Sequence, residues 1–418
     1  MFDLDNWQEI FSTIKKNKLR TFLTAFGVFW GVFMLVVMMG SGNGLKNGVL
    51  RDFNGTATNS FFVWAQRTNK AYDGFQPGRR FNYNNDDVAA IREFIPELAA
   101  IAPRNQLGNY EGRNAVYRNN KTGSFSVYGD YPDTFKIETL NLLDGRTINK
   151  LDIDQKRKIA LIGTRVRDLL FNKGENPIGE YIKINGVYFA VVGVFYSRKT
   201  GRQAEEETSN VHVPFTTFQT TFNYGDRVGW FSFMAKDGIQ ASKVEEKVIT
   251  LLKERHHISP EDQMAVGHWN MEKEYNKIMG LFNGITGLVW VVGVGTLLAG
   301  IIGVSNIMLI IVRERTREIG IKRALGAEPY MIIGQIILES VFLTSIAGYF
   351  GLIAGLGVIQ AVASSIPADA EGPFYNPEVD VQLVLISLAI LVVSGALAGL
   401  IPAKRAVEIA PIDALRAE

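Results

Sequence analysis

The stretch IMGLFNGITGLVWVVGVGTLLAGIIGVSNIMLIIV, residues 278–312, contains no Asp, Glu, Lys or Arg. As a helix it would extend about 52 Å, whereas the hydrocarbon core of a membrane is about 30 Å thick. The segment is therefore long enough to cross a membrane and to protrude on one side. The alternative is a break between Gly280 and Gly287, which would leave a shorter span and a separate surface segment.

Three more segments, residues 20–45, 331–361 and 381–403, are almost free of charged side chains. Each exceeds the roughly 20 apolar residues that a membrane-spanning helix needs. A buried helix of a soluble protein seldom runs so far without a charged face. The four segments together predict a membrane protein with four transmembrane helices.

The distribution of basic residues predicts the orientation, because Lys and Arg next to membrane spans stay on the cytoplasmic side. They gather before the first span, between the second and third spans and after the fourth: Lys15, Lys16, Lys18, Arg20, Arg313, Arg315, Arg317, Lys322, Arg323, Lys404, Arg405 and Arg416. The link at residues 362–380 carries acidic residues and no Lys or Arg. Both termini, including the tail of residues 404–418, are expected in the cytoplasm, and residues 46–277 outside it.

The first 19 residues place Trp7, Ile10, Phe11 and Ile14 at helical spacing, which predicts an amphipathic helix on the inner membrane surface. A cleavable signal peptide is the alternative. The apolar run that follows is too long for one, and no clear A-x-A cleavage site follows it. We therefore expect an uncleaved anchor.

Residues 46–277 alternate between strand-like and helix-like segments, which predicts a large α+β extracytoplasmic domain with a subdomain inserted at about residues 131–225. Asn185-Gly186 separates two apolar runs and predicts a β-hairpin. The expected strands are residues 59–65, 159–162, 181–184 and 188–194, and the expected helices are residues 86–94 and 243–255.

The sequence of this domain gives little indication of catalytic or metal chemistry. His256, His257 and His268 match no zinc-ligand spacing, and the chain has no Cys. The polar stretch Tyr196 to Asn210 resembles a solvated loop, and no nucleophile motif occurs. The pattern favours a protein-binding domain without a metal.

Within the spans, glycines recur at i, i+4, a spacing that lets helix backbones approach closely in lipid. The packing glycines predicted in this way are Gly27, Gly31, Gly351, Gly355, Gly395 and Gly399. They fit contacts within the chain and contacts between two copies of it equally well. Glu339 is an intramembrane acid that fits either a functional group or a partner for the nearby basic loop.

The segment RERTREIGIKRALG, residues 313–326, predicts a short charged helix on the cytoplasmic side. Glu318 and Lys322 stand at i, i+4, and Gly326 followed by Pro329 is a helix stop. A basic membrane anchor needs no capped helix with interleaved apolar residues. The segment therefore fits a docking element better.

Several motifs together resemble the MacB/FtsX-type permeases of ABC transporters. The loop NIMLIIVRERTREIGIKRALGA (306–327), the start KKNKLRTFLTAFGV (15–28) and the end GLIPAKRAVEIAPIDALRAE (399–418) resemble that family. Four internal segments resemble the MacB-like periplasmic core domain: LLDGRTI (142–148), ALIGTRVRDLLF (160–171), NPIGEYIKINGVYFAVVGVF (176–195) and VHVPFTTFQ (211–219).

In that family the cytoplasmic loop docks on the nucleotide-binding subunit, so the resemblance assigns ATPase coupling to residues 313–327. The coupling residues that it implies are Arg313, Glu314, Arg315, Arg317, Glu318, Ile319, Gly320, Lys322, Arg323, Leu325 and Gly326. It also implies a permease homodimer in the bacterial inner membrane with two ATPases and, for exporters, a periplasmic adaptor and an outer-membrane channel. No nucleic-acid partner is expected.

The sequence lacks the G-x-x-x-x-G-K-[ST] phosphate loop, and only about 20 residues precede the first span. We therefore expect a chain that is not an enzyme, binds no cofactor and depends on a separate ATPase that uses ATP and Mg²⁺. The resemblance implies mechanotransmission: closure of the ATPases moves the cytoplasmic helix, and the membrane helices carry the motion outward.

Efflux of peptides, macrolides or other envelope substrates is the first interpretation. Release of lipoproteins and activation of a cell-wall hydrolase are alternatives within the family. The large external domain argues against hydrolase activation. A membrane sensor is the alternative from another class, although no output domain is visible at either terminus.

Overall fold

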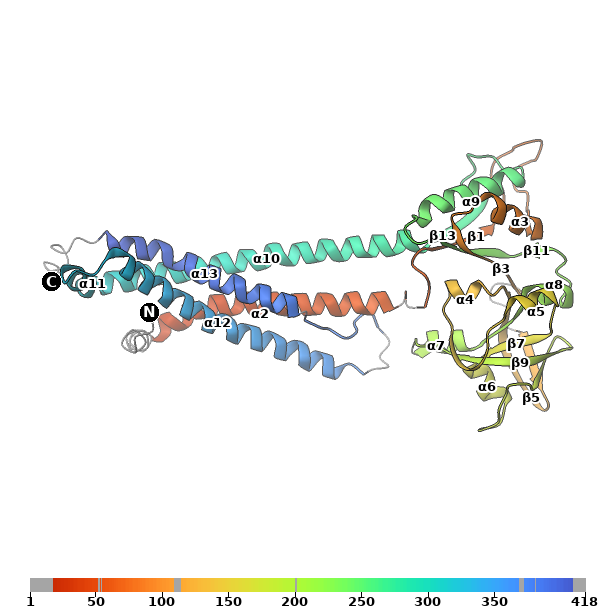
Figure 1. The fold of residues 1–418 in the computed structure, drawn as a ribbon, viewed down its shortest axis with the longest axis horizontal. Helices are drawn as coiled ribbons and strands as arrows, with labels where there is room; N and C mark the ends of the chain where they lie inside the picture. Colours follow the sequence, from red (N-terminus) through yellow and green to blue (C-terminus); the bar gives the residue numbers. More distant parts are fainter. Residues whose placement is uncertain are drawn as a thin grey trace. The chain divides into compact units, whose positions relative to one another are not determined.

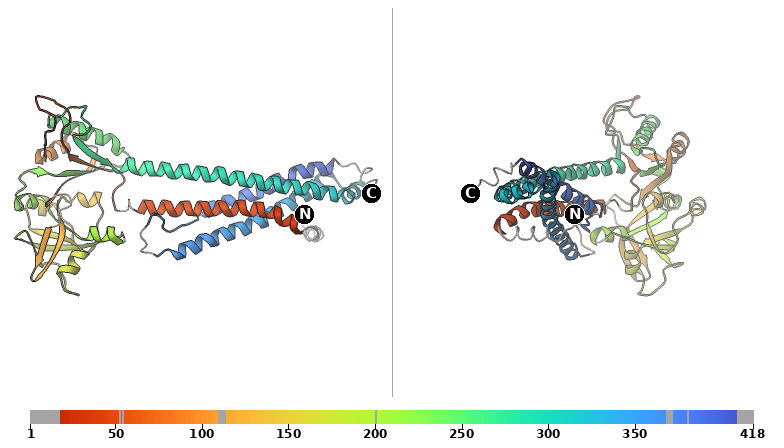
Figure 2. Two further views of the ribbon diagram at one scale, coloured as in Figure 1. Left: turned by 180° about the vertical axis from the view of Figure 1, so that it is seen from behind. Right: turned by 60° about the vertical axis from the view of Figure 1, so that its left-hand side comes forward.

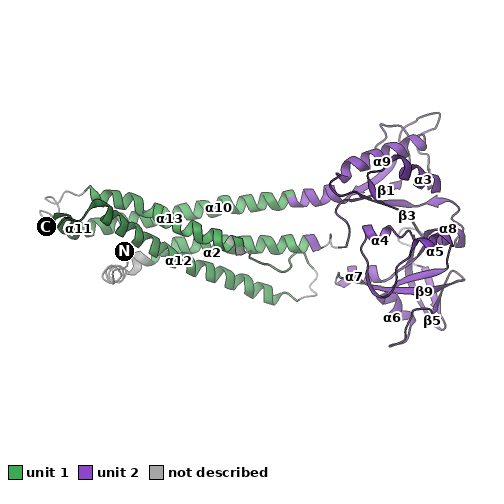
Figure 3. Cartoon of the chain, viewed as in Figure 1, with its two compact units in different colours: residues 1–49, 280–368, 372–418 green, residues 50–279, 369–371 purple. Residues whose placement is uncertain are grey.

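The computed structural model of this 418-residue chain describes residues 18–51, 53, 55–108, 114–199, 201–367, 372–379 and 381–408. The predicted surface-helix residues Trp7, Ile10, Phe11 and Ile14 lie outside this range. The chain divides into two compact units: residues 1–49, 280–368 and 372–418 form unit 1, and residues 50–279 and 369–371 form unit 2 (Figure 3).

Unit 1 is built from long apolar helices that run alongside one another (Figure 1; Figure 2, left). They are α2 (Lys18–Arg51), α10 (Met271–Glu314), α12 (Pro329–Ser365) and α13 (Val381–Val407), with the short α11 (Thr316–Ala324) between α10 and α12. All four long helices are long and apolar enough to cross a membrane. Among the described residues, the prediction of four such helices is confirmed.

Helix α10 has 44 residues and runs without interruption through Gly280 and Gly287, where a break was the alternative. It begins at Met271, seven residues before the apolar stretch, because the polar segment MEKEYNK consists mainly of helix-forming residues. At 1.5 Å per residue the helix is about 66 Å long, roughly twice the thickness of the hydrocarbon core.

Each of the six predicted packing glycines faces another helix of unit 1. Gly27 and Gly31 face α10, Gly351 and Gly355 face α2, and Gly395 and Gly399 face α12. A Cβ on Gly351 would lie 2.5 Å from the backbone oxygen of Phe29, and one on Gly355 would lie 2.9 Å from Cβ of Val36. The helix axes can be this close only because these positions lack a side chain.

A further glycine series, Gly40, Gly44 and Gly48 in α2, contacts the segment of residues 372–379. Tyr375 N donates to the backbone oxygen of Gly44 at 3.0 Å, and the side chain of Asn47 donates to the backbone oxygen of Asn376 at 3.0 Å. This contact was not predicted, although the i, i+4, i+8 spacing of the three glycines is visible in the sequence.

Unit 2 is a mixed α+β domain with one 11-stranded sheet and a separate two-stranded sheet formed by its second and eleventh strands. Its strands are β1 (Ser60–Ala65), β2 (Tyr83–Asn84), β3 (Leu98–Gln106), β4 (Asn114–Arg118), β5 (Lys121–Asp130), β6 (Asn141–Gly145), β7 (Ile159–Gly163), β8 (Tyr181–Ile184), β9 (Val187–Tyr196), β10 (Asn210–Pro214), β11 (Arg227–Val228), β12 (Trp230–Ala235) and β13 (Val266–Asn270). Its helices are α3 (Asn85–Phe94), α4 (Thr134–Ile137), α5 (Lys150–Asp154), α6 (Thr164–Leu170), α7 (Gly201–Thr208), α8 (Phe215–Thr221) and α9 (Ala241–Arg255).

The strand order is β10-β7-β9-β8-β4-β5-β3-β12-β1-β13, and β10 also pairs with β5, so the first six strands close into a ring. This ring encloses a hydrophobic core whose residues extend from Leu107 to Phe218 in the sequence. The ring includes β4 and β5 and therefore begins before residue 131, where the inserted subdomain was expected to start. A second core lies between helices α3 and α9 and strands β1, β3 and β12. Strand β3 joins the two halves, because it pairs with both β5 and β12.

The predicted hairpin is confirmed. Strands β8 and β9 pair antiparallel with Ile184 opposite Val187, and the two residues between them have φ of +44° at Asn185 and +88° at Gly186. Positive φ at both central positions is the geometry that favours Asn-Gly in a two-residue turn. Strand β1 and helices α3 and α9 are also confirmed, within a few residues of the expected bounds.

The prediction of a solvated loop over Tyr196 to Asn210 was wrong in its centre, where Gly201–Thr208 forms helix α7. High polarity favours a solvated loop but does not exclude a helix. Arg, Gln, Ala and Glu are all strong helix formers, and Arg202 lies 3.4 Å from Glu206 one turn later.

We predict that Gly351→Ala lowers the stability of the helix bundle. The added Cβ would press on the backbone of α2, which cannot move aside as a flexible side chain would, and overpacking of this kind costs about 1–3 kcal/mol. The measurement is the thermal unfolding midpoint of the full chain in detergent. Gly357→Ala is the control, because it lies in the same helix and its Cβ would meet nothing within 4 Å. Equal midpoints for the two variants would contradict the packing role.

Candidate functional site

The predicted coupling segment forms a compact element between α10 and α12. Helix α10 ends at Glu314, α11 follows one residue later, and Gly326 has φ of +97°, which favours glycine. Pro329 then occupies the first turn of α12. The structure thus brings the predicted coupling residues together on one short helix and its two ends.

Helix α11 is attached to its neighbours in unit 1 by buried contacts on one side. Arg315 Nη1 lies 3.5 Å from Glu339 Oε2, and Arg323 Nη1 donates to the backbone oxygen of Val407 at 2.7 Å. Ile319 is buried in the same hydrophobic cluster as Ile332 of α12. Glu339, whose role was left open, is therefore a partner of the basic loop. These contacts tie α11 to both α12 and the end of α13.

The opposite side of this element is exposed and combines charge with apolar surface. Arg313, Glu314, Arg317, Glu318 and Lys322 are exposed. Among them lie apolar side chains with large exposed fractions: Leu325 is 84% exposed, Tyr330 64%, Met331 55% and Ile321 43%. Isolated exposed apolar residues are common, whereas four within eleven residues of chain, beside five exposed charges, are typical of surfaces that partners bind. We call this set, with the five charged residues, the α11 surface.

Each of the three histidines examined as a possible metal ligand contacts a different carboxylate. His256 Nε2 is 2.8 Å from Asp87, His257 Nδ1 is 2.6 Å from Asp73, and His268 Nδ1 is 2.7 Å from Glu245. No group of three or more His, Asp or Glu with metal-site geometry occurs among the described residues.

Asp87 is a structural carboxylate at the start of α3. Its Oδ2 accepts from the Asn84 N–H at 2.9 Å in a reciprocal capping box, and Arg255 Nε donates to Oδ1 at 2.8 Å. Burial alone would raise the pKa of Asp87, but hydrogen bonds from His256, Arg255 and Asn84 lower it below its usual value. The ionised form is thus favoured in the folded domain.

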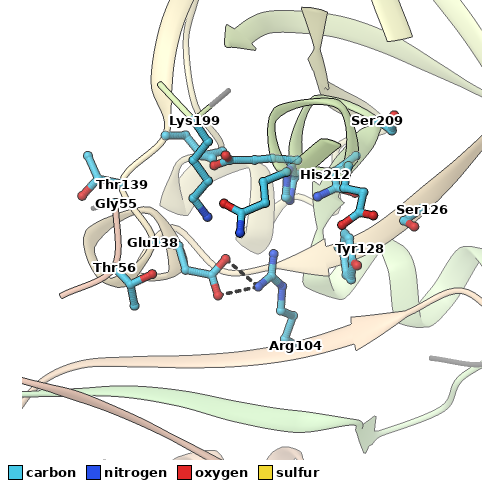
Figure 4. Close-up of a pocket in the computed structure, with 15 residues that line it drawn as sticks. Gly55, Thr56, Arg104, Ser126, Tyr128, Glu138, Thr139, Lys199, Ser209 and His212 are labelled. Atoms are coloured by element: carbon cyan, nitrogen blue, oxygen red, sulfur yellow. Dashed lines mark hydrogen bonds and ion pairs between the residues drawn. The ribbon is translucent and has the colours of Figure 1, made fainter. Parts of the chain in front are cut away.

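A second candidate site, which the sequence analysis missed, is a polar cavity of about 590 Å³ in unit 2 (Figure 4). Arg104 of β3 projects into it from below, and its side chain is only 8% exposed. Arg104 Nε lies 2.6 Å from Asp130 Oδ1, and Nη1 lies 2.8 Å from both oxygens of Glu138. His212, the one histidine not considered earlier, places Nδ1 2.6 Å from the other oxygen of Asp130.

The two carboxylates of this cluster stabilise the charged form of Arg104. Burial alone would lower the pKa of Arg104, but Asp130 and Glu138 raise it above its usual value. The guanidinium is held over the rings of Tyr128 at 4.7 Å and Trp230 at 5.7 Å. A buried Arg with two carboxylates and two aromatic rings is fixed in position and stays charged.

The described residues combine four membrane-type helices, a large α+β domain between the first two, and an exposed charged helix between the second and third. This arrangement defines a multi-pass membrane protein with a large folded domain outside the lipid. Residues 21–251 match the MacB-like periplasmic core domain, and residues 290–411 match the FtsX-like permease C-terminal domain. The chain belongs to the MacB/FtsX-type permeases of ABC transporters, as its motifs indicated.

Individual relatives are similar to nearly the whole of this chain. The chain is 29% identical over 402 residues to a pyoverdine export ATP-binding/permease protein, PvdT, of Pseudomonas entomophila, with 96% of this chain and 58% of the relative covered. It is 26% identical over 419 residues to a macrolide export ATP-binding/permease protein, MacB, of Bdellovibrio bacteriovorus, with 99% of this chain and 62% of the relative covered. The chain thus spans about three-fifths of these relatives.

Among solved structures, the periplasmic region of MacB from Actinobacillus actinomycetemcomitans aligns with a TM-score of 0.43 and 18% identity. The alignment covers 55% of this chain and 97% of that one.

We predict that Asp87→Asn lowers the free energy of unfolding of the extramembrane domain at pH 7 by about 3 kcal/mol, because it removes a buried charge from its partners. The pKa of Asp87 is depressed by folding, so its stabilisation is complete above the unfolded-state pKa of about 3.9 and is lost as the pH falls through the folded value. The difference between wild type and variant should therefore narrow below about pH 4.

The measurement is urea unfolding of the full chain in detergent, followed by tryptophan fluorescence between about pH 3 and pH 7. Asp73→Asn is the matched control, since Asp73 also pairs with a histidine but is 58% exposed. A difference that stays constant down to pH 3, or one as large for Asp73→Asn, would be evidence against this role of Asp87.

Proposed function

We propose that this chain is the permease of an ABC exporter in the bacterial inner membrane, and that an ATPase docks on the α11 surface. The observation that carries the proposal is the α11 surface itself: Leu325 is 84% exposed at the end of a charged helix, while Ile319 on the other side of α11 is packed into the helix bundle. Partner-binding patches combine an apolar anchor with a charged rim in this way.

The basic residues of this element support a cytoplasmic position. Arg313, Arg315, Arg317, Lys322 and Arg323 all lie in or beside α11, and such clusters stay on the cytoplasmic side of a membrane. ATP is available on that side, so α11 and both termini are assigned to the cytoplasm. Unit 2 is then extracytoplasmic, which agrees with the family description of its sequence as a periplasmic core domain.

The way in which α11 is attached supports mechanotransmission as the mechanism. A force on α11 reaches α12 through the pair Arg315–Glu339 and reaches α13 through the hydrogen bond from Arg323 to Val407. It reaches α10 directly along the chain, because only Arg315 separates the two helices. In this mechanism, α10 transmits the motion along its whole length. The ATPase binds ATP and Mg²⁺.

The cargo is proposed from the relatives, whose names describe export of pyoverdine and of macrolides. We assign efflux of peptide-like or macrolide-like compounds to this chain, as a permease homodimer that works with a periplasmic adaptor and an outer-membrane channel. The same names describe ATP-binding/permease proteins, which agrees with an ATPase as the partner.

We predict that Leu325→Asp abolishes capture of the ATPase. The variant places a charge at the apolar centre of the α11 surface, whereas Leu325 is almost fully exposed within the chain and contributes little to its folding. The experiment co-expresses the chain with the ABC ATPase encoded beside it, purifies the chain in detergent, and measures the ATPase recovered and the rate of ATP hydrolysis. At least about a tenfold loss of recovery is expected.

Met264→Asp is the control, because Met264 is an exposed apolar residue of unit 2, 63% exposed, far along the chain from α11. It should recover as much ATPase as the wild type. If Leu325→Asp also recovers a normal amount, the docking site is elsewhere. A stable wild-type chain that never captures an ATPase would favour the sensor interpretation.

A further inference from the structure

The polar cavity around Arg104 continues into a larger cleft of about 1090 Å³ within unit 2. The two share Thr56, Arg104, Tyr128, Glu138, Lys199 and Asn210 in their walls. They lie where β3 passes from the ring of strands to the second half of the sheet. Ligand sites form preferentially where two parts of a domain meet, in cavities of this size.

Arg104 is positioned so that part of its guanidinium remains available to a ligand. Nε of Arg104 forms an ion pair with Asp130, and Nη1 donates hydrogen bonds to Glu138. The donors of Nη2 are therefore the ones that these two carboxylates do not engage. Figure 4 shows the guanidinium pointing from β3 into the cavity, with Lys199 extending toward it from the opposite wall. Both of these cationic groups present hydrogen-bond donors to the cavity.

The charged side chains of the larger cleft are mainly cationic. Its wall carries Arg104, Lys199 and Arg227 against one acid, Glu138, whereas Glu206 and Glu207 line only the smaller cavity. Neither Lys199 nor Arg227 has an acidic partner among the described residues. At the smaller cavity, Arg202 lies 3.4 Å from Glu206, and Ser197 donates to Glu207. The groups left to meet a ligand are cationic.

The larger cleft also offers an aromatic wall. Trp64, Trp230 and Trp269 line it together with Phe62, and Trp269 is 51% exposed. Phe62 and Trp269 lie on the neighbouring strands β1 and β13 with ring centroids 6.3 Å apart. Trp230 of this wall lies beside Arg104, and an aromatic wall next to a fixed cation suits ligands that carry both an apolar or aromatic group and an anionic group.

We propose that this cleft binds an organic carboxylate that carries an aromatic or apolar group. Its carboxylate accepts hydrogen bonds from Arg104 and Lys199, and its apolar group lies against Trp230, the tryptophan nearest to Arg104 in this wall. Arg is suited to this role because its donors match the geometry of a carboxylate. The proposal rests on the proposed export function only in assigning such compounds as cargo, and the binding itself needs no ATPase.

The test uses two probes that differ only in charge, N-acetylphenylalanine and its neutral amide. Binding to the full chain in detergent, without ATPase, is followed by tryptophan fluorescence and by calorimetry. For ligands of this size we expect a Kd of the order of 1 mM for the acid and at least about tenfold weaker binding for the amide. Lys199→Gln should weaken the acid about five- to tenfold and leave the amide unchanged.

Lys243→Gln is the matched control, because Lys243 is an exposed lysine of unit 2 on α9 and does not line the cleft. It should bind both probes as the wild type does. Equal affinities for acid and amide, or no saturable binding by about 10 mM, would overturn the proposal. So would an effect of Lys199→Gln no larger than that of Lys243→Gln. Because the ATPase is absent from this test, failure here leaves the docking experiment at Leu325 unaffected, and the reverse also holds.

Discussion

Lipid offers the backbone no hydrogen-bond partners, and this constraint determines the structure of unit 1. Each apolar segment meets it as a continuous helix, which satisfies the backbone groups internally. Helices in lipid have no hydrophobic drive to associate, so they depend on close contact. Gly351 and Gly355 allow α12 to approach α2, while Gly395 and Gly399 allow α13 to approach α12. The attachment of α11 depends on this packing, since its partners lie on α12 and α13.

Sequence predicted the elements whose signals are local. Asn185-Gly186 specifies its turn by backbone conformation alone, and charge-free stretches specify membrane helices by length and composition. The prediction was wrong over Gly201–Thr208, where polarity outweighed helix propensity in the interpretation. The contact of Gly48 with residues 372–379 was missed for another reason: glycine spacing shows that a helix has a close neighbour without showing which segment that neighbour is.

For the α11 surface, the sequence predicted the helix, its stop and its charge. It could not predict which side faces outward, because that depends on tertiary contacts. Ile319 and Leu325 are both apolar residues of one short segment, yet Ile319 packs against α12 and Leu325 is exposed. The difference arises from Arg315 and Arg323, whose contacts with Glu339 and Val407 hold one side of α11 against the bundle.

The Arg104 cluster lay beyond local reasoning altogether, because its members come from distant parts of the chain. The topology brings them together: β5 pairs with β3 on one side and with β10 on the other, which places Asp130 between Arg104 and His212. A buried charge is costly unless its partners are in place, so a one-residue shift in either pairing would leave Asp130 or Arg104 uncompensated. We infer that the cluster specifies the register that joins the two halves of unit 2. The same fixed geometry is what leaves one face of Arg104 directed into the cleft.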